Sequence, residues 1–332
     1  MIVDRRTRKR VLRWVVIVAI GVLAVVFVRR LDPARALEVI ATADVWSVIA
    51  AMLVNATLRV GTRVLRTRSL LSLLPGAVPL RQLAQFVYGS MALGYIVSPI
   101  AGSAARVFAL QYHGVPSEAV VAVGLWEKVV TGATLAMFSG VMLVRETPPE
   151  AHYSLLVATL LGSIGLAVAI LAATVFRHLT RHHATPTTRA RRWLFSLGRS
   201  LAQLNDARTL VRTFVWSTLS ELCDVAMLGL VMHALGLPVD PVACVLAFVV
   251  MNMSTVLPST PGQLGVFEAT TAWALAATGV APERALACGI LYHLVHVVPV
   301  FIVGLPSLLR IRVEKREDDI KRSRELPVQP RS

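Results

Sequence analysis

The sequence predicts an all-α polytopic membrane protein with six to eight transmembrane helices, arranged as two inverted repeats that each contain a broken or re-entrant hairpin. Three observations support this fold class. The chain of 332 residues is 55% hydrophobic and only 16% charged, with a mean hydropathy of +0.66, so it is more apolar than a typical soluble domain. It contains long apolar runs. Two further apolar segments are interrupted by proline and glycine at matching places of a diverged repeat.

The long apolar runs supply the predicted membrane helices. A helix needs about 20 apolar residues to cross a hydrocarbon core of roughly 30 Å. The first run follows a basic segment, as in a signal peptide, but Arg29 and Arg30 stand where a cleavage site is expected, so we interpret it as an uncleaved first helix. The runs that approach or exceed the required length are 12–28, 43–58, 118–143, 153–176, 209–235 and 285–309.

The net charge of +15 arises from basic residues clustered beside these runs. Six lie in 1–13, five with no acid in 59–81, seven in 177–208 and eight against five acids in 310–332. This distribution is typical of cytoplasmic loops, and it offers no organised basic face for nucleic acid. The predicted organisation is a basic cytoplasmic N-terminus at 1–11, one membrane domain at 12–309 with a basic cytoplasmic loop at 177–208, and a charged cytoplasmic tail at 310–332.

Two apolar segments cannot be ordinary helices. Residues 258–268 read PSTPGQLGVFE and residues 98–106 read SPIAGSAAR. Proline removes a backbone donor and glycine loosens the chain, so each helix must break where lipid offers no hydrogen-bond partner. The charges of the flanking loops place both ends of 84–105 in the cytoplasm and both ends of 242–278 outside. We therefore predict two re-entrant segments of opposite orientation, with eight plain spanning helices as the alternative.

An internal alignment supports this pairing of the two segments. Residues 84–99 align without gaps on 246–261, and 114–130 align on 279–295, with ten identities in 33 positions. Combined with the loop charges, the alignment predicts an inverted-topology repeat of the kind found in transporters. The two halves extend over about 84–143 and 242–309.

The repeat places opposite charges at equivalent positions. Arg106 lies seven residues after Pro99, and Glu268 lies seven residues after Pro261. If the halves meet around a pseudo-two-fold axis, these two side chains flank one central site, where the arginine binds a phosphate and the glutamate opposes an amine or a proton. The alternative is a plain ion pair between Arg106 and Glu268 that locks the hairpins together.

Other polar residues lie within predicted membrane helices. Ser217, Ser220, Glu221 and Asp224 share one helix face at i, i+3, i+4 and i+7. Each charge near the bilayer centre costs roughly 2.5–3.5 kcal/mol on insertion scales, so this face must avoid lipid. We expect it to line a cavity, with purely structural interhelical bonding as the alternative. Glu127 is a further acid within a predicted span.

Two other groups have simpler interpretations. His293 and His296 are three residues apart and could ligate a metal, but no carboxylate or cysteine shares a recognised spacing with them, so interhelical hydrogen bonding is favoured. Arg59, Arg63 and Arg66 form a basic helical face that we interpret as a headgroup contact at the cytoplasmic boundary. We expect no metal and no cofactor, and the sequence contains no phosphate-binding P-loop motif.

The motifs PSTPGQLGVFE, GSAARVFALQYHG and GLWEKV together resemble the membrane domain of lysylphosphatidylglycerol synthases, a flippase-like family. The resemblance extends over roughly 10–310. Members usually carry two glycines after the proline, whereas this chain has Gly262 followed by Gln263. Full-length synthases aminoacylate the lipid with a separate soluble domain, and no stretch here is long enough to form one, so a stand-alone membrane member is expected. The resemblance implies a functional set of Pro261, Gly262, Gly265, Glu268, Arg106 and Glu127.

These features favour a lipid translocase of a bacterial-type plasma membrane, with both termini cytoplasmic. Its cargo would be an anionic, aminoacylated, glycosylated or isoprenoid lipid, carried past the hydrocarbon by buried charges and opposed breaks. A non-catalytic scaffold for envelope-lipid enzymes is the first alternative. A membrane-embedded transferase is a weaker one, because no nucleotide-sugar or metal motif accompanies the acids. Membrane lipids are the expected partners, together with a second copy of the chain or a lipid-synthesis enzyme.

Overall fold

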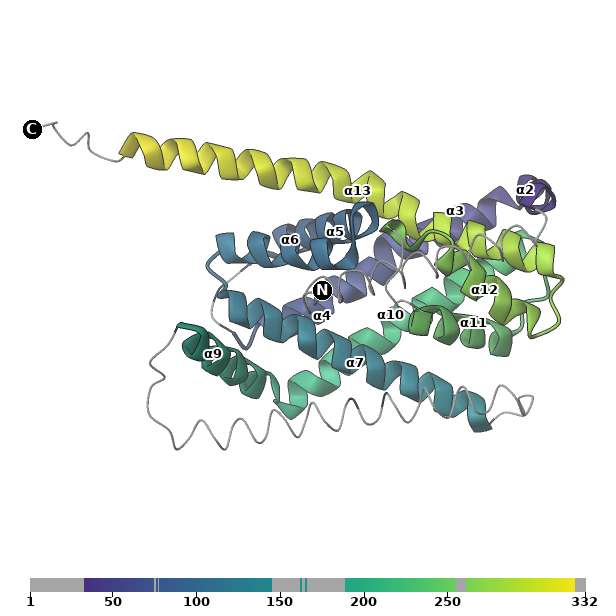
Figure 1. The fold of residues 1–332 in the computed structure, drawn as a ribbon, viewed down its shortest axis with the longest axis horizontal. Coiled ribbons are helices and arrows are strands. Elements are labelled where there is room, and N and C mark those ends of the chain that lie inside the picture. The colour runs from purple at the N-terminus through teal and green to yellow at the C-terminus, as the bar shows by residue number, and fades with distance from the viewer. Residues whose placement is uncertain are drawn as a thin grey trace, which may run out of the picture.

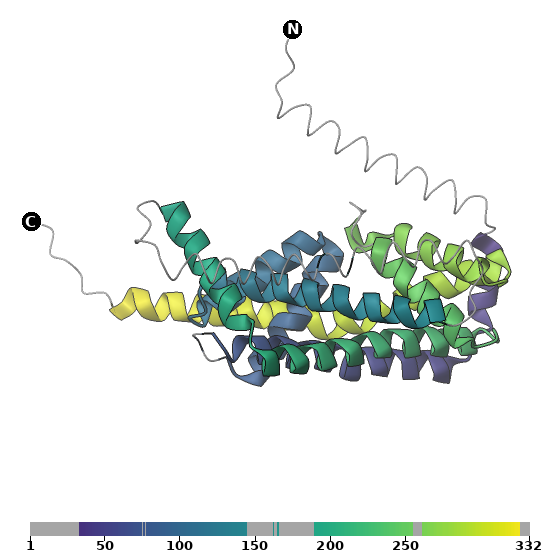
Figure 2. The same ribbon diagram turned by 90° about the horizontal axis from the view of Figure 1, so that it is seen from below.

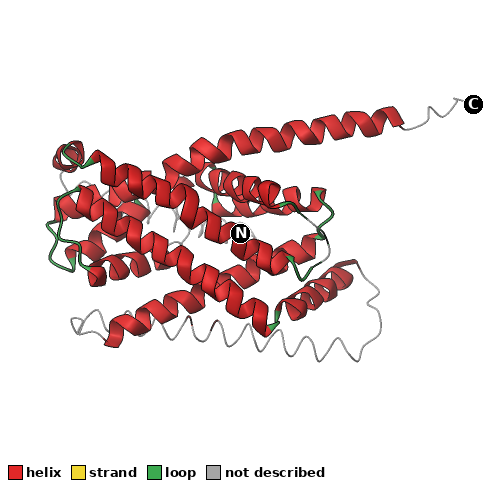
Figure 3. Cartoon of the chain, turned by 180° about the vertical axis from the view of Figure 1, so that it is seen from behind, coloured by secondary structure: helices red, strands yellow, loops and turns green. Residues whose placement is uncertain are grey.

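A computed structural model describes residues 33–144 apart from 75 and 77, residues 162 and 165, and the ranges 189–254 and 261–325. Within these ranges the chain is helical and contains no strand (Figure 3). The elements are α2 (Pro33–Ala41), α3 (Val45–Leu53), η1 (Val54–Arg59), α4 (Val60–Leu71), α5 (Leu80–Ile96), α6 (Pro99–Tyr112), α7 (Ser117–Val144), α9 (Arg189–Leu204), α10 (Ala207–Ala234), α11 (Pro241–Ser254), η2 (Pro261–Gln263), α12 (Val266–Ala276) and α13 (Pro282–Glu325).

Four helical segments are long and apolar enough to cross a membrane. They are Val45–Leu71, Ser117–Val141, Ala207–Ala234 and Pro282–Arg310. The prediction of a helical membrane protein is therefore confirmed, whereas the total of six to eight spans stays a prediction. The predicted run at 12–28, and 153–176 apart from two residues, lie outside the described residues.

The first of these segments corrects the predicted span at 43–58 and the basic loop that was expected from 59 onward. α3, η1 and α4 form one continuous helical segment, so Arg59, Arg63 and Arg66 lie inside a candidate membrane span and not in a loop. A hydropathy scale ends the predicted span at the first arginine because it assigns every arginine the cost of an unpaired charge. The structure pairs these charges with polar side chains of α10, as described below, which removes most of the cost of burying them.

The middle of this segment is a π-helix, η1, which is linked to neighbouring helices through the Ala56 carbonyl and the Asn55 side chain. The Tyr88 hydroxyl donates to the Ala56 carbonyl. Asn55 Nδ2 donates to the Val295 carbonyl at 2.8 Å and to the His296 carbonyl at 3.0 Å. Pro299 lies inside α13 and has no N–H, so the carbonyl four residues earlier loses its helical partner. Asn55 replaces that partner from another helix.

Substitution of Asn55 by leucine is therefore expected to cost about 1–3 kcal/mol of unfolding free energy, because it leaves a buried carbonyl without a donor. In a Pro299→Ala background the restored N–H of residue 299 satisfies Val295 within α13, and the cost should become smaller. Reversible unfolding in mixed micelles measures both values. An equal cost in the two backgrounds would contradict the assigned role of Asn55.

Both interrupted segments form hairpins of short helices. α5 and α6 pack side by side, and so do α11 and α12 (Figure 1). A new helix begins at Pro99 because Ser98 caps it by accepting a hydrogen bond from the Ala101 N–H at 3.2 Å. In the second hairpin the turn before α12 contains Gly262 and Gly265 with φ of 69° and 83°. Each helix is shorter than the roughly 20 residues that a span needs.

Each hairpin is followed by a long helix, so α5–α6–α7 and α11–α12–α13 have the same element order. Their apolar side chains form two separate clusters. One joins α4 to α7 with α9 around Phe86 and Trp126. The other joins α10 to α13 with residues of α2, α3 and the second half of α7 around Phe248 and Tyr292. Figures 1 and 2 show the first hairpin and the second hairpin in different parts of the molecule, with α13 running past both. The inverted relation of the two halves stays a prediction.

The predicted polar loop at 177–208 is wrong in part, because 189–204 form the amphipathic helix α9. α9 packs on α7, where the Trp126 indole donates to the Leu201 carbonyl at 3.2 Å and Ser196 donates to Glu118 at 2.9 Å. The many basic residues of this segment suggested a loop, so the apolar face of α9 was not recognised from the sequence. The tail predicted from 310 likewise continues α13 as helix to Glu325.

Candidate functional site

A polar cavity of about 310 Å³ lies where residues of both hairpins and four long helical segments converge. Its walls carry five cationic and three acidic side chains, a formal excess of two positive charges when histidine is counted as neutral. These charged residues are Arg59, Arg63, Arg66, Arg106, Lys128, Glu127, Glu221 and Asp224. The two hairpins contribute Ser103 and Gln263 among others. Such a concentration of charge within membrane segments indicates a functional site.

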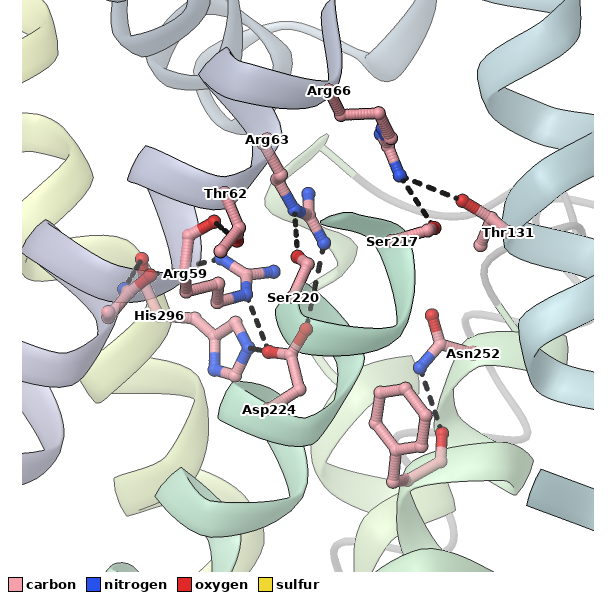
Figure 4. A network of polar contacts seen from close by, with 12 residues as sticks. Arg59, Thr62, Arg63, Arg66, Thr131, Ser217, Ser220, Asp224, Asn252 and His296 are labelled. Carbon is pink, nitrogen blue, oxygen red and sulfur yellow. Dashed lines mark hydrogen bonds and ion pairs between the residues drawn. The ribbon is translucent and has the colours of Figure 1, made fainter. Parts of the chain in front are cut away.

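In this cavity the basic face of η1 and α4 meets the polar face of α10. Arg59, Arg63 and Arg66 recur at i, i+4 and i+7 and face the polar stripe of α10. Arg63 Nε donates to the Ser220 hydroxyl at 3.2 Å. Arg66 Nη1 donates to Ser217 at 3.1 Å and to Thr131 of α7 at 3.2 Å (Figure 4). The two stripes are therefore complementary.

Asp224 is the centre of this network and is only 2% exposed. Its Oδ1 lies 2.6 Å from Arg59 Nε and 2.7 Å from His296 Nε2, and its Oδ2 lies 3.6 Å from Arg63 Nη2 (Figure 4). The Tyr292 hydroxyl donates to the Asp224 backbone carbonyl at 3.0 Å. Three helical segments are thus joined through one carboxylate, whose buried charge is compensated from several sides.

A second ion pair holds the first hairpin against α7. Arg106 Nη2 lies 2.8 Å from Glu127 Oε2, and the Thr67 hydroxyl donates to the other carboxylate oxygen. Glu127 is 6% exposed, so its carboxylate is largely shielded from water. Arg106 therefore connects α6 to α7 and, through Thr67, to α4.

Three charged groups of the cavity keep unused hydrogen-bonding capacity. Arg66 Nε and Glu221 Oε2 are buried and have no hydrogen-bond partner in the described part of the chain. No carboxylate of that part forms an ion pair with Arg66 or with Lys128, which is exposed on the cavity wall. Native proteins rarely leave buried polar groups unpartnered, and a ligand is one reason to do so. We treat these three side chains as the candidate contacts of a bound molecule.

The described part of the PSTPGQLGVFE motif, residues 261–268, belongs to the turn of the second hairpin and the start of α12. η2 begins at Pro261, and a Cβ at Gly262 would lie 3.1 Å from the Tyr95 carbonyl, so this turn meets the end of α5 closely. Gln263 adopts a left-handed φ of 60°. Such a conformation is unfavourable for a residue with a side chain. The side chain at this position therefore strains the turn.

The Glu268 side chain folds back on this turn and stabilises it. Its Oε2 accepts a hydrogen bond from the Gly265 N–H at 2.7 Å, which forms a capping box at the start of α12. Its Oε1 lies 2.7 Å from His293 Nδ1. Glu268 lines a separate, apolar cavity and does not line the polar one.

The structure therefore brings together four of the predicted site residues, Arg106, Glu127, Glu221 and Asp224, in one cavity. Glu268 and Gly262 line the second cavity, whereas Gln263 and Phe267 of the same motif line the polar one, and Pro261 and Gly265 line neither. The alternative of an ion pair between Arg106 and Glu268 is wrong, because Arg106 pairs with Glu127 and Glu268 with His293. That the two residues flank one transport site stays a prediction. Each charge of the repeat connects its hairpin to the long helix that follows.

The remaining predictions have mixed outcomes. Interhelical bonding of His293 and His296 is confirmed, because His293 lies 2.7 Å from Glu268 of α12 and His296 lies 2.7 Å from Asp224 of α10. The headgroup interpretation of Arg59, Arg63 and Arg66 is wrong in its placement, since Arg59 and Arg66 are 5% and 8% exposed. Their i, i+4, i+7 spacing was the signal for this site. Residues of the α10 stripe recur with the same spacing, so a comparison of the two patterns would have predicted that these two helix faces contact each other.

Comparison with known proteins agrees with this architecture. The model of the family described as the lysylphosphatidylglycerol synthase TM region matches residues 13–304. The chain is also similar to the glycosyltransferase AglD of Haloferax volcanii, with 37% identity over 95 residues. That match covers 27% of this chain and 15% of AglD, so the chain spans only a small part of this curated relative. Because the family model covers most of the sequence, the chain belongs to the family of the lysylphosphatidylglycerol synthase transmembrane region.

Proposed function

We propose that the protein is a lipid translocase that moves a lipid with an anionic headgroup between membrane leaflets. The observation that carries this proposal is the polar cavity, in which cations outnumber acids and Arg66 and Lys128 have no paired carboxylate among the described residues. The planar guanidinium of Arg66 and the ammonium of Lys128 provide complementary donors for phosphate oxygens. The protein then acts as a transporter and not as an enzyme.

The physical barrier to lipid movement is the headgroup, because an ion in hydrocarbon loses its hydration. A cavity that offers fixed donors at membrane depth replaces the lost water. Its volume of about 310 Å³ suits a headgroup, while the acyl chains stay in the surrounding lipid. Both hairpins border this cavity, the first through residues of its two helices and the second through Gln263 of its turn. Paired breaks of this kind are where transporters of other folds hold their substrates.

The alternative of a non-catalytic scaffold requires polar residues that only join helices. Asp224 and Glu127 fit that role, since their carboxylates are fully engaged. Arg66, Glu221 and Lys128 do not fit it, because they retain free capacity inside the cavity. We therefore favour translocation. We propose a plasma-membrane location with cytoplasmic termini on the basis of the basic clusters at the ends of the chain.

Replacement of Arg66 by glutamine is expected to slow translocation of an anionic phospholipid by about tenfold or more, because a hydrogen bond to a charged group contributes about 1.5–3 kcal/mol. The assay uses proteoliposomes that contain fluorescent phosphatidylglycerol or phosphatidylcholine with identical chains, and dithionite to bleach the outer leaflet. Wild-type protein should accelerate the exchange of phosphatidylglycerol more than that of phosphatidylcholine.

Arg68→Gln is the matched control for this experiment. Arg68 lies two residues further along α4, is exposed and does not line the cavity, so its loss should leave the rate unchanged. Equal slowing by both substitutions would mean that the cavity has no special part in the reaction. If wild-type protein accelerates neither lipid, the translocase proposal is wrong and the scaffold alternative is preferred.

A further inference from the structure

The acids of the polar cavity balance only part of its positive charge. Asp224 Oδ1 lies 2.6 Å from Arg59 Nε, and Glu127 Oε2 lies 2.8 Å from Arg106 Nη2, so these two acids and two arginines compensate each other. Asp224 also lies 3.6 Å from a second arginine, but its single charge neutralises only one of them. The charged residues that remain on the wall are the cations Arg63, Arg66 and Lys128 and the acid Glu221.

These three cations converge on one part of the cavity from two helices. Arg63 and Arg66 are three residues apart on α4, and both extend toward α10 (Figure 4). Arg66 Nη1 also donates to the Thr131 hydroxyl of α7 at 3.2 Å. Lys128 lies three residues before Thr131 on the same face of α7. The helix therefore places its cation next to the position that Arg66 contacts, and all three cations line the cavity.

At least two positive charges of this group have no counter-charge among the described residues. Arginine stays protonated in proteins, and Lys128 is exposed on the wall, where an ammonium keeps its charge at neutral pH. Glu221 balances one of the three charges when it is ionised and none when it is protonated. Uncompensated charge is costly within membrane segments, so a ligand with two negative charges stabilises the cavity by completing the balance.

We propose that the lipid bound in the polar cavity ends in a phosphate monoester or a diphosphate, a headgroup with about two negative charges. A phosphate monoester carries a charge of about −1.5 to −2 at pH 7 and has three terminal oxygens. A phosphodiester keeps a single charge. The three oxygens match the donors of Arg63, Arg66 and Lys128. The inference rests on the proposed translocase function and specifies the class of its substrate.

Other headgroups fit this charge distribution less well. An aminoacylated headgroup adds a positive charge, which the three cations repel. An uncharged sugar leaves the balance as it is, and a phosphodiester supplies half of it. The cavity volume of about 310 Å³ lies at the lower end of the roughly 300–1,000 Å³ typical of ligand pockets, which favours a compact group.

The test measures lipid binding to the full chain in phosphatidylcholine nanodiscs. The probe is phosphatidic acid with a fluorescent acyl chain. Its competitors are unlabelled phosphatidic acid, a monoester, and phosphatidylmethanol, the methyl diester with the same chains. In wild-type protein the monoester should compete about tenfold better than the diester, because the second charge strengthens its hydrogen bonds to the cations. Equal competition, or no binding of the probe, would overturn the proposal.

Substitutions of Lys128 relate this preference to the cavity. Lys128→Gln removes one positive charge and should reduce the preference for the monoester to about twofold or less, whereas Lys128→Arg keeps the charge and should retain it. Arg68→Gln, which removes an exposed charge outside the cavity, should also retain it. A full preference in Lys128→Gln would contradict the assignment of the second charge to this site.

Failure of this inference is distinguishable from failure of the proposed function. Movement of phosphatidylglycerol that depends on Arg66, together with equal binding of monoester and diester, would keep the translocase and remove the doubly charged substrate. Preferential binding of the monoester without any lipid movement would keep the site and remove the translocase. Glycerol phosphate carries the same group without acyl chains. Competition by it as strong as that of phosphatidic acid would assign the site to a soluble phosphate and overturn the lipid substrate.

Discussion

Replacement of Asp224 by asparagine is expected to lower the free energy of unfolding by about 3–5 kcal/mol. The carboxylate lies within 2.7 Å of both Arg59 Nε and His296 Nε2, and it is 2% exposed. Loss of its charge leaves a buried guanidinium without its counter-ion. Removal of one partner of a buried pair is more costly than the net contribution of the pair, because the other charge stays behind. Unfolding in mixed micelles, followed by circular dichroism, measures the change.

Glu221→Gln supplies the matched comparison. Glu221 lies on the same face of α10, is 1% exposed and borders the same cavity, but it makes no ion pair in the described part of the structure. Its neutralisation should change the unfolding free energy by less than about 1 kcal/mol. A similar loss in both variants would show that burial of an acid, and not its pairing, determines stability here.

A double variant separates the pair from its surroundings. Arg59→Gln combined with Asp224→Asn removes both charges, so the combined loss should be clearly smaller than the sum of the two single losses. Simple additivity would contradict a direct coupling of Arg59 to Asp224. The lipid assay on Glu221→Gln then tests the cavity, because this variant should remain folded.

The buried stripe of α10 was predictable from the sequence, whereas its partners were not recognised. The i, i+3, i+4, i+7 spacing of Ser217, Ser220, Glu221 and Asp224 indicates a face that avoids lipid, and all four are buried. Hydropathy treats each arginine as a reason to end a membrane helix. It has no means to register that a charge on another helix compensates that arginine, so the span was ended at 58 instead of at Leu71.

The hairpins were predictable because proline and glycine act locally. Ser98 caps a new helix that begins at Pro99, and Gly262 and Gly265 adopt the positive φ that a tight turn requires. Both features follow from the backbone preferences of these residue types. The partner of Arg106 depends instead on how three helices pack, which opposite signs at repeat-equivalent positions do not determine. Glu127 was recognised as a candidate, but its bond to Arg106 required the packing of α6 on α7.

Substitution of Gly102 by alanine is expected to cost about 3 kcal/mol or more, because it drives two backbones of the first hairpin apart. A Cβ at this position would lie 2.3 Å from the Ser90 carbonyl oxygen and 3.0 Å from the Gly94 backbone. The obstacles are main-chain atoms of α5, which cannot move aside as a flexible side chain does. Ser90 and Gly94 form a small-residue surface of the kind that lets membrane helices approach closely.

Gly61→Ala provides the contrast that makes this result specific. Gly61 lies in α4 and a Cβ there meets nothing within 4 Å, so alanine should be neutral or stabilise the helix by up to about 1 kcal/mol. Separation of α5 from α6 also moves Ser103 and Arg106, which line the polar cavity. Gly102→Ala should therefore reduce both stability and the exchange of anionic lipid. A variant that loses neither would mean that α5 and α6 do not need close contact, and that the cavity is not set by the shape of this hairpin.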